Sequence, residues 1–389
     1  MSAVIAGYAR TPFAKYTGVF RDIPATALGA HAARAALTRA GVSPTEVDRV
    51  IAGQVIQAAA GQNPARQTAV AAGVPFAIPA ITLNAVCLSG MEAIVEGVRL
   101  IDWGEADIVL AVGQESMSLA PHAMVGSRVG TKYGAIELID TLERDGLSDA
   151  FQHQSMGAST ESQNGPLHIT REDQDAWAAR SHAALAASVD FLTGEIEPFT
   201  VEGRKSVTLS DDDGLRADTT VETLAKLRPA FGANGTITAG TSSQVTDGAS
   251  AVVLMSESLA QKRGVSRLTR VIDHAFVAGP DVYLHSQPSR AITAAIARTD
   301  YIISDLVAVE INEAFAAVAV HSTRELGIHE RIVNSHGGAI ALGHPIGASG
   351  NRIVGHLARR LQELGPGSIG AAGICGGGGQ GSAVILEAL

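Results

Sequence analysis

Apolar and polar positions follow two patterns along this chain: short apolar runs, and longer segments with helical spacing. Apolar runs at residues 4–6, 48–53 and 107–113 are typical of buried strands. At about 25–40, Ala and Leu side chains recur on one face of a predicted helix, and Gly41 is expected to end it. Strands that alternate with helices predict a layered α/β fold.

A cysteine stands where one such strand gives way to a helix. Residues 77–83 are strand-like, and apolar positions spaced by three and four follow Cys87. A thiol at a helix start faces unpaired N–H groups and the positive end of the helix dipole, so we expect the pKa of Cys87 to fall. Cys87 is then either a nucleophile or, as is common for cysteine, a buried structural residue.

The C-terminal part repeats this order of elements at a constant offset. Ser349 lies 260 residues after Ser89, and Gly373 lies 260 residues after Gly113. An apolar run at 306–312 and a helical segment at 291–297 match their first-half counterparts at about the same offset. Several matches at one offset predict an internal duplication into two α/β halves related by a pseudo-twofold axis. Cys87 and the loop at 343–350 are then expected near that axis.

The pattern changes between these halves. Glycines mark loops in the early part of residues 118–246, and Thr170 followed by acidic residues indicates a helix start. We therefore predict an N-terminal half at 1–117, an inserted loop domain at 118–246 and a C-terminal half at 247–389. Residues 247–265 would complete the N-terminal half. The insertion could cover a site.

Composition narrows the functional class. The chain has 389 residues, a formal net charge of −10 and two cysteines far apart. The acidic balance disfavours a nucleic-acid partner. Two distant cysteines provide neither a disulfide framework nor zinc-ligand spacing, so we expect no metal and a reduced, cytoplasmic setting. The N-terminus lacks the pattern of a signal peptide, and no apolar run is long enough to span a membrane.

Four segments carry reactive polar residues, most of them among glycines. They centre on Cys87, Asn312, His344 and Cys375. Glycine lets backbone N–H groups point at an anion, so a nucleotide phosphate loop is the competing interpretation. That interpretation is disfavoured because the chain has no Gly-x-x-x-x-Gly-Lys-Ser/Thr, and no Gly-x-Gly-x-x-Gly opens a helix after the first strand.

Short motifs along nearly the whole chain point to one family. Beyond the residues around Cys87 they are Gly-Gln-Glu-Ser-Met-Ser at 113–118, Met-Gly at 156–157, Leu-Arg-Pro-Ala-Phe at 227–231, Gly-Thr-Ile-Thr-Ala-Gly at 235–240, Asn-Glu-Ala-Phe at 312–315, Gly-His-Pro at 343–345 and Cys-Gly-Gly at 375–377. With these motifs the chain resembles the thiolases, the family of acetyl-CoA acetyltransferases and 3-ketoacyl-CoA thiolases. The resemblance implies a duplicated thiolase fold, with two βαβαβαββ-type halves in a five-layer αβαβα arrangement and an inserted loop domain.

The resemblance also implies a role for each reactive residue. Cys87 would be the acyl-carrying nucleophile, and His344 would take its proton. Cys375 would be the second acid/base. Asn312 would hold a water that, with His344, polarises the thioester oxygen, and the backbone N–H groups of Cys87 and Gly377 would form a second oxyanion site. A helix cap is the alternative for Asn312.

CoA contacts are implied in the same way. The nucleotide end would lie near Arg216 and Thr223, and the pantetheine would lie along Ala239 and Ser243. Arg216 would supply local positive charge, or else be an ordinary solvated surface arginine. Candidates for apolar walls, which could equally be core residues, are Met156, Phe231 and Phe315.

The implied activity is acetyl-CoA C-acetyltransferase, a reversible Claisen condensation of two acetyl-CoA to acetoacetyl-CoA and CoA. It needs no cofactor, because CoA is the substrate carrier, and it belongs to lipid and fatty acid metabolism. The alternative is a degradative thiolase for longer 3-ketoacyl-CoA. Ser155, His285 and Gln287 depart from the family pattern around the acyl site and leave chain length open.

Two further alternatives stay open. A decarboxylating ketoacyl synthase would show a second His where Asn312 stands, and a non-catalytic acyl-CoA-binding protein would not need Cys87. The loop at 118–134 resembles one that joins dimers into tetramers in related enzymes, so a homotetramer is expected.

Overall fold

The structure is a computed structural model that describes residues 2–265 and 267–389, so Met1, the first residue of the predicted N-terminal half, lies outside it. Its centre is a ten-stranded sheet, in which the two-residue β2 (Ala14–Lys15) pairs only with β10. The other strands follow one another across the sheet in this order: β12 (Leu306–Ile311), β13 (Ile369–Gly376), β14 (Gln380–Ala388), β11 (Thr269–Ala278), β1 (Ala3–Arg10), β10 (Thr246–Ser256), β5 (Ile108–Glu115), β3 (Arg49–Gly53) and β4 (Ala80–Leu83).

This sheet consists of two similar halves. In the first, β4, β3 and β5 are parallel and β10 and β1 are antiparallel. In the second, β12 and β13 are parallel, β14 and β11 are antiparallel, and Val333 bridges to Val309 at the position of β4. Among the described residues, the two half-sheets are hydrogen-bonded to each other where Val4 and Ile5 of β1 pair with β11. The repeated strand order confirms the predicted duplication.

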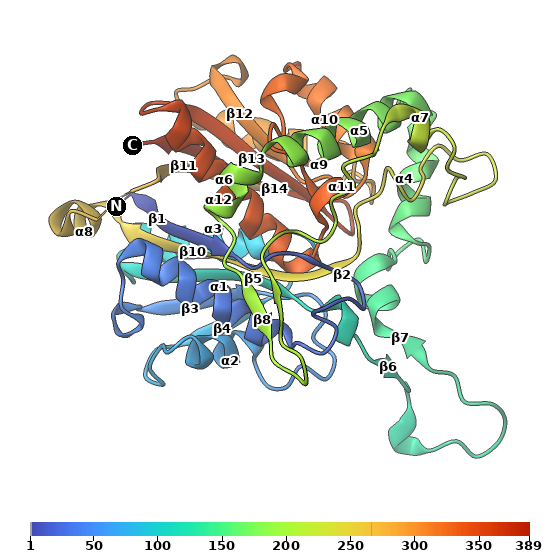
Figure 1. Ribbon diagram of the computed structural model, residues 1–389, viewed down its shortest axis with the longest axis horizontal. Coiled ribbons are helices and arrows are strands. Elements are labelled where there is room, and N and C mark those ends of the chain that lie inside the picture. Colours follow the sequence, from blue (N-terminus) through green and yellow to red (C-terminus); the bar gives the residue numbers. More distant parts are fainter. Residues whose placement is uncertain (1, 266) are drawn as a thin grey trace.

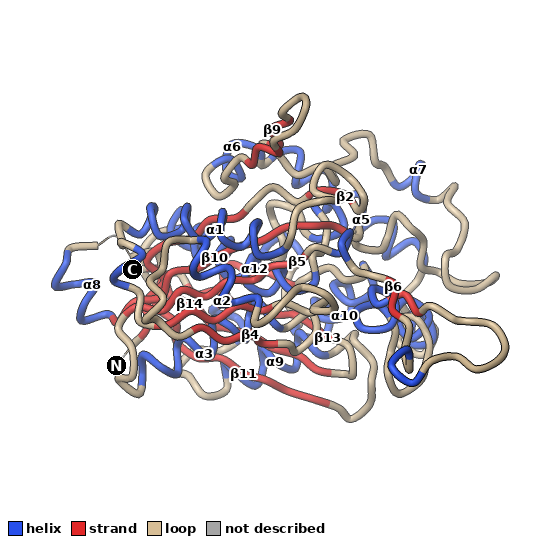
Figure 2. The backbone as a smooth tube through the Cα atoms, turned by 90° about the horizontal axis from the view of Figure 1, so that it is seen from below, coloured by secondary structure: helices blue, strands red, loops and turns tan. Residues whose placement is uncertain are grey.

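Helices form three layers around these two half-sheets (Figures 1 and 2). The outer helices of the first half are α1 (Ala25–Ala40) and α2 (Pro64–Ala71), and those of the second half are α9 (Gln287–Ile296) and α10 (Ala316–Leu326). Between the half-sheets lie α3 (Ser89–Asp102) and α12 (Ile346–Leu364), packed against each other and against both half-sheets. The result is the predicted five-layer α/β arrangement.

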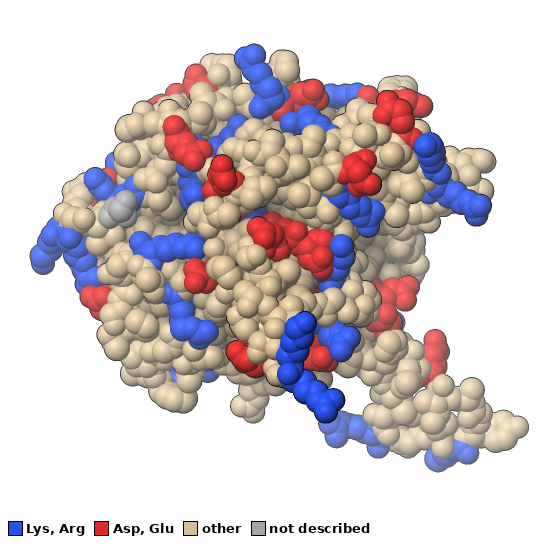
Figure 3. Space-filling model, in the orientation of Figure 1, with Lys and Arg blue, Asp and Glu red and all other residues tan. Residues whose placement is uncertain are grey.

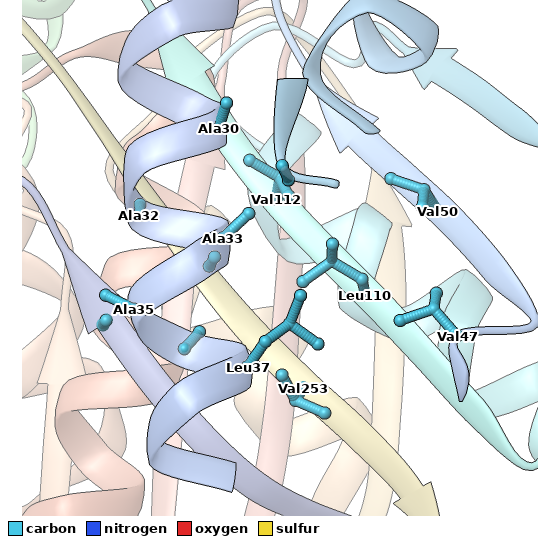
Figure 4. Packing of buried hydrophobic residues seen from close by; sticks show 14 of the residues in the cluster. Ala30, Ala32, Ala33, Ala35, Leu37, Val47, Val50, Leu110, Val112 and Val253 are labelled. Atoms are coloured by element: carbon cyan, nitrogen blue, oxygen red, sulfur yellow. The ribbon is translucent and has the colours of Figure 1, made fainter. Parts of the chain in front are cut away.

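Small side chains bring α1 close to its half-sheet. In Figure 4, Ala30, Ala33 and Leu37 of α1 lie over Leu110 and Val112 of β5, and all five are buried. The helix has the predicted bounds because Gly41 adopts a left-handed φ of 63° and accommodates the chain reversal after Ala40.

The two central helices meet at glycines that occupy equivalent positions of the duplication. A Cβ on Gly90 of α3 would lie 2.6 Å from the Gly347 carbonyl oxygen, and a Cβ on Gly350 of α12 would lie 2.6 Å from the Met91 nitrogen. This reciprocal contact places both helix starts near the pseudo-twofold axis, as the offset predicts. The expectation that 343–350 is loop throughout is wrong, because α12 begins at Ile346. Gly347 and Gly350 provide close helix packing instead of a turn.

The insertion between β5 and β10 consists mostly of short elements, and α5 (Arg171–Ala187) is its longest helix. Thr170 caps α5 reciprocally with Asp173, as predicted. The hairpin of β6 and β7 projects from the body of the molecule in Figure 1. The elements are η2 (Met117–Leu119), β6 (His122–Ala123), η3 (Ser127–Val129), β7 (Ile139–Asp140), η4 (Glu143–Leu147), α4 (Met156–Asn164), α5 (Arg171–Ala187), α6 (Val189–Thr193), β8 (Phe199–Val201), β9 (Val207–Leu209) and α7 (Val221–Leu224).

Short helices complete the two halves: η1 (Pro44–Glu46), α8 (Glu257–Arg263), η5 (Ile303–Asp305), η6 (Glu330–Ile332) and α11 (Ala339–Leu342). Within the described residues, no helix is both long and apolar enough to cross a bilayer. On the face shown in Figure 3, acidic and basic side chains are interspersed and form no large patch of one sign.

Candidate active site

A small cavity between the two halves collects four of the five predicted catalytic residues. It has a volume of about 70 Å³, and Cys87, His344, Cys375 and Gly377 all line it. Cys87 precedes α3, His344 precedes α12, and Cys375 and Gly377 lie at the end of β13 and in the turn after it. The other lining residues are mostly apolar: Val86, Gly146, Leu147, Met156, Ser243, Leu284, Ala314, Phe315 and Ile346.

The backbone before α3 presents Cys87 at the edge of the cavity. Val86 has a φ of 53°, a left-handed conformation that is strained for a β-branched residue. Ser89 holds this turn, because its Oγ accepts a hydrogen bond from Ala85 N at 2.9 Å and donates one to Val86 O at 2.6 Å. Cys87 therefore lies two residues before the first helical residue, in a sharp turn outside the helix.

The prediction that the helix start lowers the pKa of Cys87 is wrong. Desolvation raises the pKa of the Cys87 thiol to about 12. The backbone N–H groups of Cys87 and Gly377 oppose this rise because both stabilise the thiolate, while the negative charge of Glu115 adds to it. Cys87 is thus a thiol at rest, and a base must remove its proton.

The hydrogen bonds of His344 select one tautomer of its imidazole ring. Its Nδ1 lies 2.6 Å from Ser349 Oγ, and the Ser349 hydroxyl donates to Pro345 O at 3.1 Å. The hydroxyl proton is therefore used, so Nδ1–H donates to Ser349 and Nε2 keeps its lone pair. Burial, assisted by the positive charge of Arg352, lowers the pKa of His344 to about 3, so the imidazole is neutral at rest.

Asn312 lies beside His344 at the end of β12. Its Nδ2 donates toward His344 Nε2 over 3.5 Å, and its backbone N donates to Gly373 O at 3.0 Å. Asn312 is fully buried, and its Oδ1 has no hydrogen-bond partner among the described residues. Asn312 does not line the cavity itself and lies behind His344, which does.

Cys375 is a second protonated thiol. It is 1% exposed, and burial raises its pKa above the usual range, with a smaller contribution from the negative charge that Cys87 can carry. A thiol with a raised pKa gives a strongly basic thiolate once its proton is lost. The cavity therefore holds a potential nucleophile, a neutral imidazole and a second acid/base.

A larger cavity of about 300 Å³ adjoins the first one. It shares Met156, Ser243, Phe315 and His344 with it, and Phe231 lines it as well. The rings of Phe231 and Phe315 meet edge to face at 6.1 Å. The predicted wall residues and Ser243 thus lie together along one path to His344.

The remaining predicted CoA residues lie elsewhere. Arg216, Thr223 and Ala239 are exposed and line neither cavity. Thr223 has a structural role, because its backbone and side chain bond to Thr220 and cap α7. Arg216 N donates to His182 Nδ1 at 3.3 Å, and Gly214, two residues before Arg216, accepts from the Gln244 amide at 2.9 Å.

Three further residues support the site and were not predicted. Gln244 accepts from His344 N at 2.9 Å through its backbone oxygen, and Ser349 orients the imidazole. Glu115 accepts from Val55 N, Ile56 N and Gly347 N, and burial raises its pKa to about 8. Two of them carried a signal in the sequence: Glu115 lies in the motif at 113–118, and Ser349 follows His344 by five residues at the start of a helical pattern.

No group of three or more His, Cys, Asp and Glu side chains is placed to hold a metal ion anywhere in 2–265 or 267–389. The residues of the site carry two thiols, an imidazole and backbone N–H groups, with the Asn312 amide beside the imidazole.

Two family models match the chain: the thiolase N-terminal domain over residues 3–258 and the thiolase C-terminal domain over residues 265–388. A probable acetyl-CoA acetyltransferase of Mycobacterium leprae is 49% identical and is aligned over 100% of both chains. The acetyl-CoA acetyltransferase of Shinella zoogloeoides is 43% identical over 100% of this chain and 99% of its own.

Solved structures show the same relationship. The Bacillus anthracis acetyl-CoA acetyltransferase superimposes with a TM-score of 0.96 at 36% identity, covering 100% of this chain and 99% of the other. Human mitochondrial 3-ketoacyl-CoA thiolase superimposes with a TM-score of 0.95 at 37% identity, covering 100% and 98%. The chain is therefore similar both to proteins named acetyl-CoA acetyltransferase and to one named 3-ketoacyl-CoA thiolase.

Proposed function

Because this chain belongs to the thiolase family and is an acyltransferase, we propose that it joins two acetyl-CoA into acetoacetyl-CoA and CoA, reversibly, through an acetyl group carried on Cys87. One observation carries this proposal: Cys87, His344, Cys375 and Gly377, drawn from both halves of the duplication, line one cavity of about 70 Å³. The proposed route uses this chain's own groups, with CoA as the carrier.

In the first half-reaction, His344 Nε2 takes the Cys87 proton as Sγ attacks the thioester carbon of acetyl-CoA. The N–H groups of Cys87 and Gly377 bind the tetrahedral oxyanion. The CoA sulfur leaves with the proton of Cys375. The site then holds acetyl-Cys87, a Cys375 thiolate and an imidazolium on His344, so charge is conserved.

In the second half-reaction, the Cys375 thiolate removes a proton from the methyl carbon of a second acetyl-CoA. The enolate oxygen is stabilised by His344 and by the Asn312 amide. The enolate carbon attacks acetyl-Cys87, and the Cys87 sulfur leaves and takes back the proton from His344. All three side chains return to their resting forms, and thiolysis is the same sequence in reverse.

The size of the cavity favours a short acyl group. Val86, Met156, Leu284 and Phe315 close it, and Val86, Met156 and Gly377 separate it from an outer groove of about 850 Å³. A degradative thiolase for longer chains would need a path into such a groove.

A steady-state substrate panel in the thiolysis direction tests the acyl preference. We expect acetoacetyl-CoA to be cleaved with a kcat/KM at least about tenfold above that of a long-chain 3-ketoacyl-CoA, the loss that about 1.4 kcal/mol of poorer transition-state binding causes. Turnover of the long substrates alone would establish the degradative alternative instead.

We also propose a homotetramer in a reducing, cytoplasmic compartment. The hairpin at 119–138 exposes apolar side chains that a monomer would leave in water, including Val129 at 85% and Tyr133 at 98% exposure. Cys87 and Cys375 must remain thiols for the proposed chemistry. Sedimentation should give four times the 40.0 kDa chain mass, and a mass equal to a single chain would exclude the tetramer.

A further inference from the structure

Glu313 follows Asn312 directly and is 0% exposed. Four donors surround its carboxylate. Oε1 accepts from Trp177 Nε1 and from Asn334 Nδ2, both at 2.9 Å. Oε2 accepts from Ser181 Oγ at 2.7 Å and from Ile340 N at 3.1 Å. Both oxygens of a buried carboxylate are thus fully bonded.

These donors belong to three separate parts of the chain. Trp177 and Ser181 lie on α5 of the insertion, Asn334 follows η6, and Ile340 lies in the first turn of α11. The α11 donor belongs to the segment that leads to His344, four residues after Ile340. The carboxylate therefore connects the Asn312 turn with the His344 segment and with the insertion.

The backbone is shaped around this carboxylate. A Cβ on Gly338 would lie 2.4 Å from the Glu313 Cδ, so only glycine fits there. Gly338 N donates to Ser181 Oγ at 3.0 Å, which ties α5 to the same segment. Glu313 cannot shift without leaving buried donors unpaired, which is unfavourable for each of them.

We propose that Glu313 is a positioning residue that sets the separation between Asn312 and His344, now 3.5 Å between Nδ2 and Nε2. The inference rests on the proposed function, in which these two groups stabilise the enolate oxygen of the second half-reaction. The first half-reaction uses the N–H groups of Cys87 and Gly377 for its oxyanion and His344 as the base for Cys87, so it does not use Asn312. Loss of Glu313 should therefore impair the second half-reaction more than the first.

Glu313→Gln tests this difference. The amide keeps the shape but turns its NH2 group toward two of the four donors. Two reactions are compared: exchange of labelled CoA into acetyl-CoA, which needs only acylation of Cys87, and condensation of acetyl-CoA. Both rates are divided by the fraction of protein that acquires an acetyl adduct, so misfolded protein does not count.

We expect condensation to fall about 100-fold, the effect of losing one oxyanion donor, while exchange falls less than about threefold. An equal fall in both rates, or an unchanged condensation rate, would overturn the positioning role. Trp177→Phe, which removes one donor and keeps the carboxylate, covers the case in which Glu313→Gln does not fold. It should lower condensation about fivefold, roughly one neutral hydrogen bond, with exchange unchanged, and equal losses there count against the inference in the same way.

The variant Asn312→Ala distinguishes a failure of the Glu313 proposal from a failure of the proposed function on which it rests. If Asn312→Ala lowers exchange and condensation equally, the assignment of the enolate oxygen to Asn312 and His344 is wrong. If Asn312→Ala lowers condensation selectively but Glu313→Gln does not, the mechanism stands and only the role of Glu313 fails.

Discussion

The thiols of Cys87 and Cys375 are protonated at rest, and the imidazole of His344 is neutral. Desolvation causes all three states: it raises the pKa of Cys87 and Cys375 and lowers that of His344. Free enzyme should therefore show no charge change at these groups between pH 5 and pH 9. Catalytic charge forms only when acetyl-CoA binds and Cys87 gives its proton to His344.

Ser349 fixes the reactive tautomer of His344, so its loss should slow the chemistry without weakening CoA binding. For Ser349→Ala we expect kcat to fall about tenfold or more with KM within about twofold, because the imidazole is free to adopt the wrong tautomer. Steady-state kinetics measures this effect.

Ser250→Ala is the matched control for Ser349→Ala. Ser250 is equally buried and bonds to Asn351 of the same helix at 2.8 Å, but it does not contact His344. Equal effects of the two substitutions would show that general loosening of α12, and not the tautomer, governs the rate.

At the residue scale, the sequence predicts which residues form the site better than it predicts their protonation states. Cys87, Asn312, His344 and Cys375 were identified by motif, and the structure brings them together. The direction of the Cys87 pKa was predicted wrongly because a helix terminus contributes about 0.3–1 kcal/mol, whereas burial shifts a pKa by several units. Burial depends on the opposite half of the molecule, which local sequence does not reveal.

At the scale of elements, glycine has two structural roles, ending a helix and allowing close packing inside one, and sequence alone does not distinguish them. Gly41 ends α1 in a left-handed turn, as predicted. Gly347 and Gly350 lie inside α12, where they admit Glu115 and the backbone of α3. The start of α12 was therefore predicted too late, because the need for close packing arises only once both halves are assembled.

Gly90→Ala should separate the two central helices. Its Cβ would meet the Gly347 carbonyl oxygen at 2.6 Å, a backbone atom that can move only with α12. We expect the substitution to cost about 1–3 kcal/mol of stability, as overpacking in a core does, and to reduce turnover because Cys87 and His344 move apart. Denaturant unfolding and steady-state kinetics measure the two effects.

Gly97→Ala on the same helix is the control for Gly90→Ala. Its Cβ would meet Leu254 Cδ1 at 2.6 Å and Val109 Cγ1 at 3.0 Å, side chains of the first half-sheet and not of α12. If Gly97→Ala reduces turnover as much as Gly90→Ala does, the glycine contact between α3 and α12 does not position the site.

At the scale of the whole molecule, the constant offset predicted both the duplication and the place where the halves meet. It could not predict the contacts of the insertion, which has no repeated counterpart. The bonds from Trp177 and Ser181 to Glu313, and the link from Gln244 to Gly214, join distant parts of the chain with no periodic signal.

Acidification should destabilise the fold below pH 6.5. Burial lowers the pKa of His344 to about 3 and that of His285 to about 4. As pH falls from 6.5 toward 4, the unfolded chain gains protons at these residues and the folded chain does not, so stability is lost. Each residue adds a slope of up to about 1.4 kcal/mol per pH unit.

Denaturant unfolding at pH 7, 6 and 5 measures this slope, and His285→Gln isolates one contribution to it. A glutamine amide can still donate to Asn164 Oδ1, which His285 Nε2 contacts at 3.0 Å, but it does not titrate. The variant should lose stability less steeply with acid than the wild type, and identical slopes would contradict the assignment.

The central claim is that Cys87 carries the acyl group, and mass spectrometry after brief treatment with acetyl-CoA and acid quenching tests it most directly. We predict one acetyl group on the peptide that contains Cys87 and none on the peptide that contains Cys375. In Cys87→Ser the adduct should be absent and turnover should fall by at least about a thousandfold. A wild-type protein without the adduct, an acetyl group on Cys375, or a Cys87→Ser variant that keeps its turnover would contradict the account.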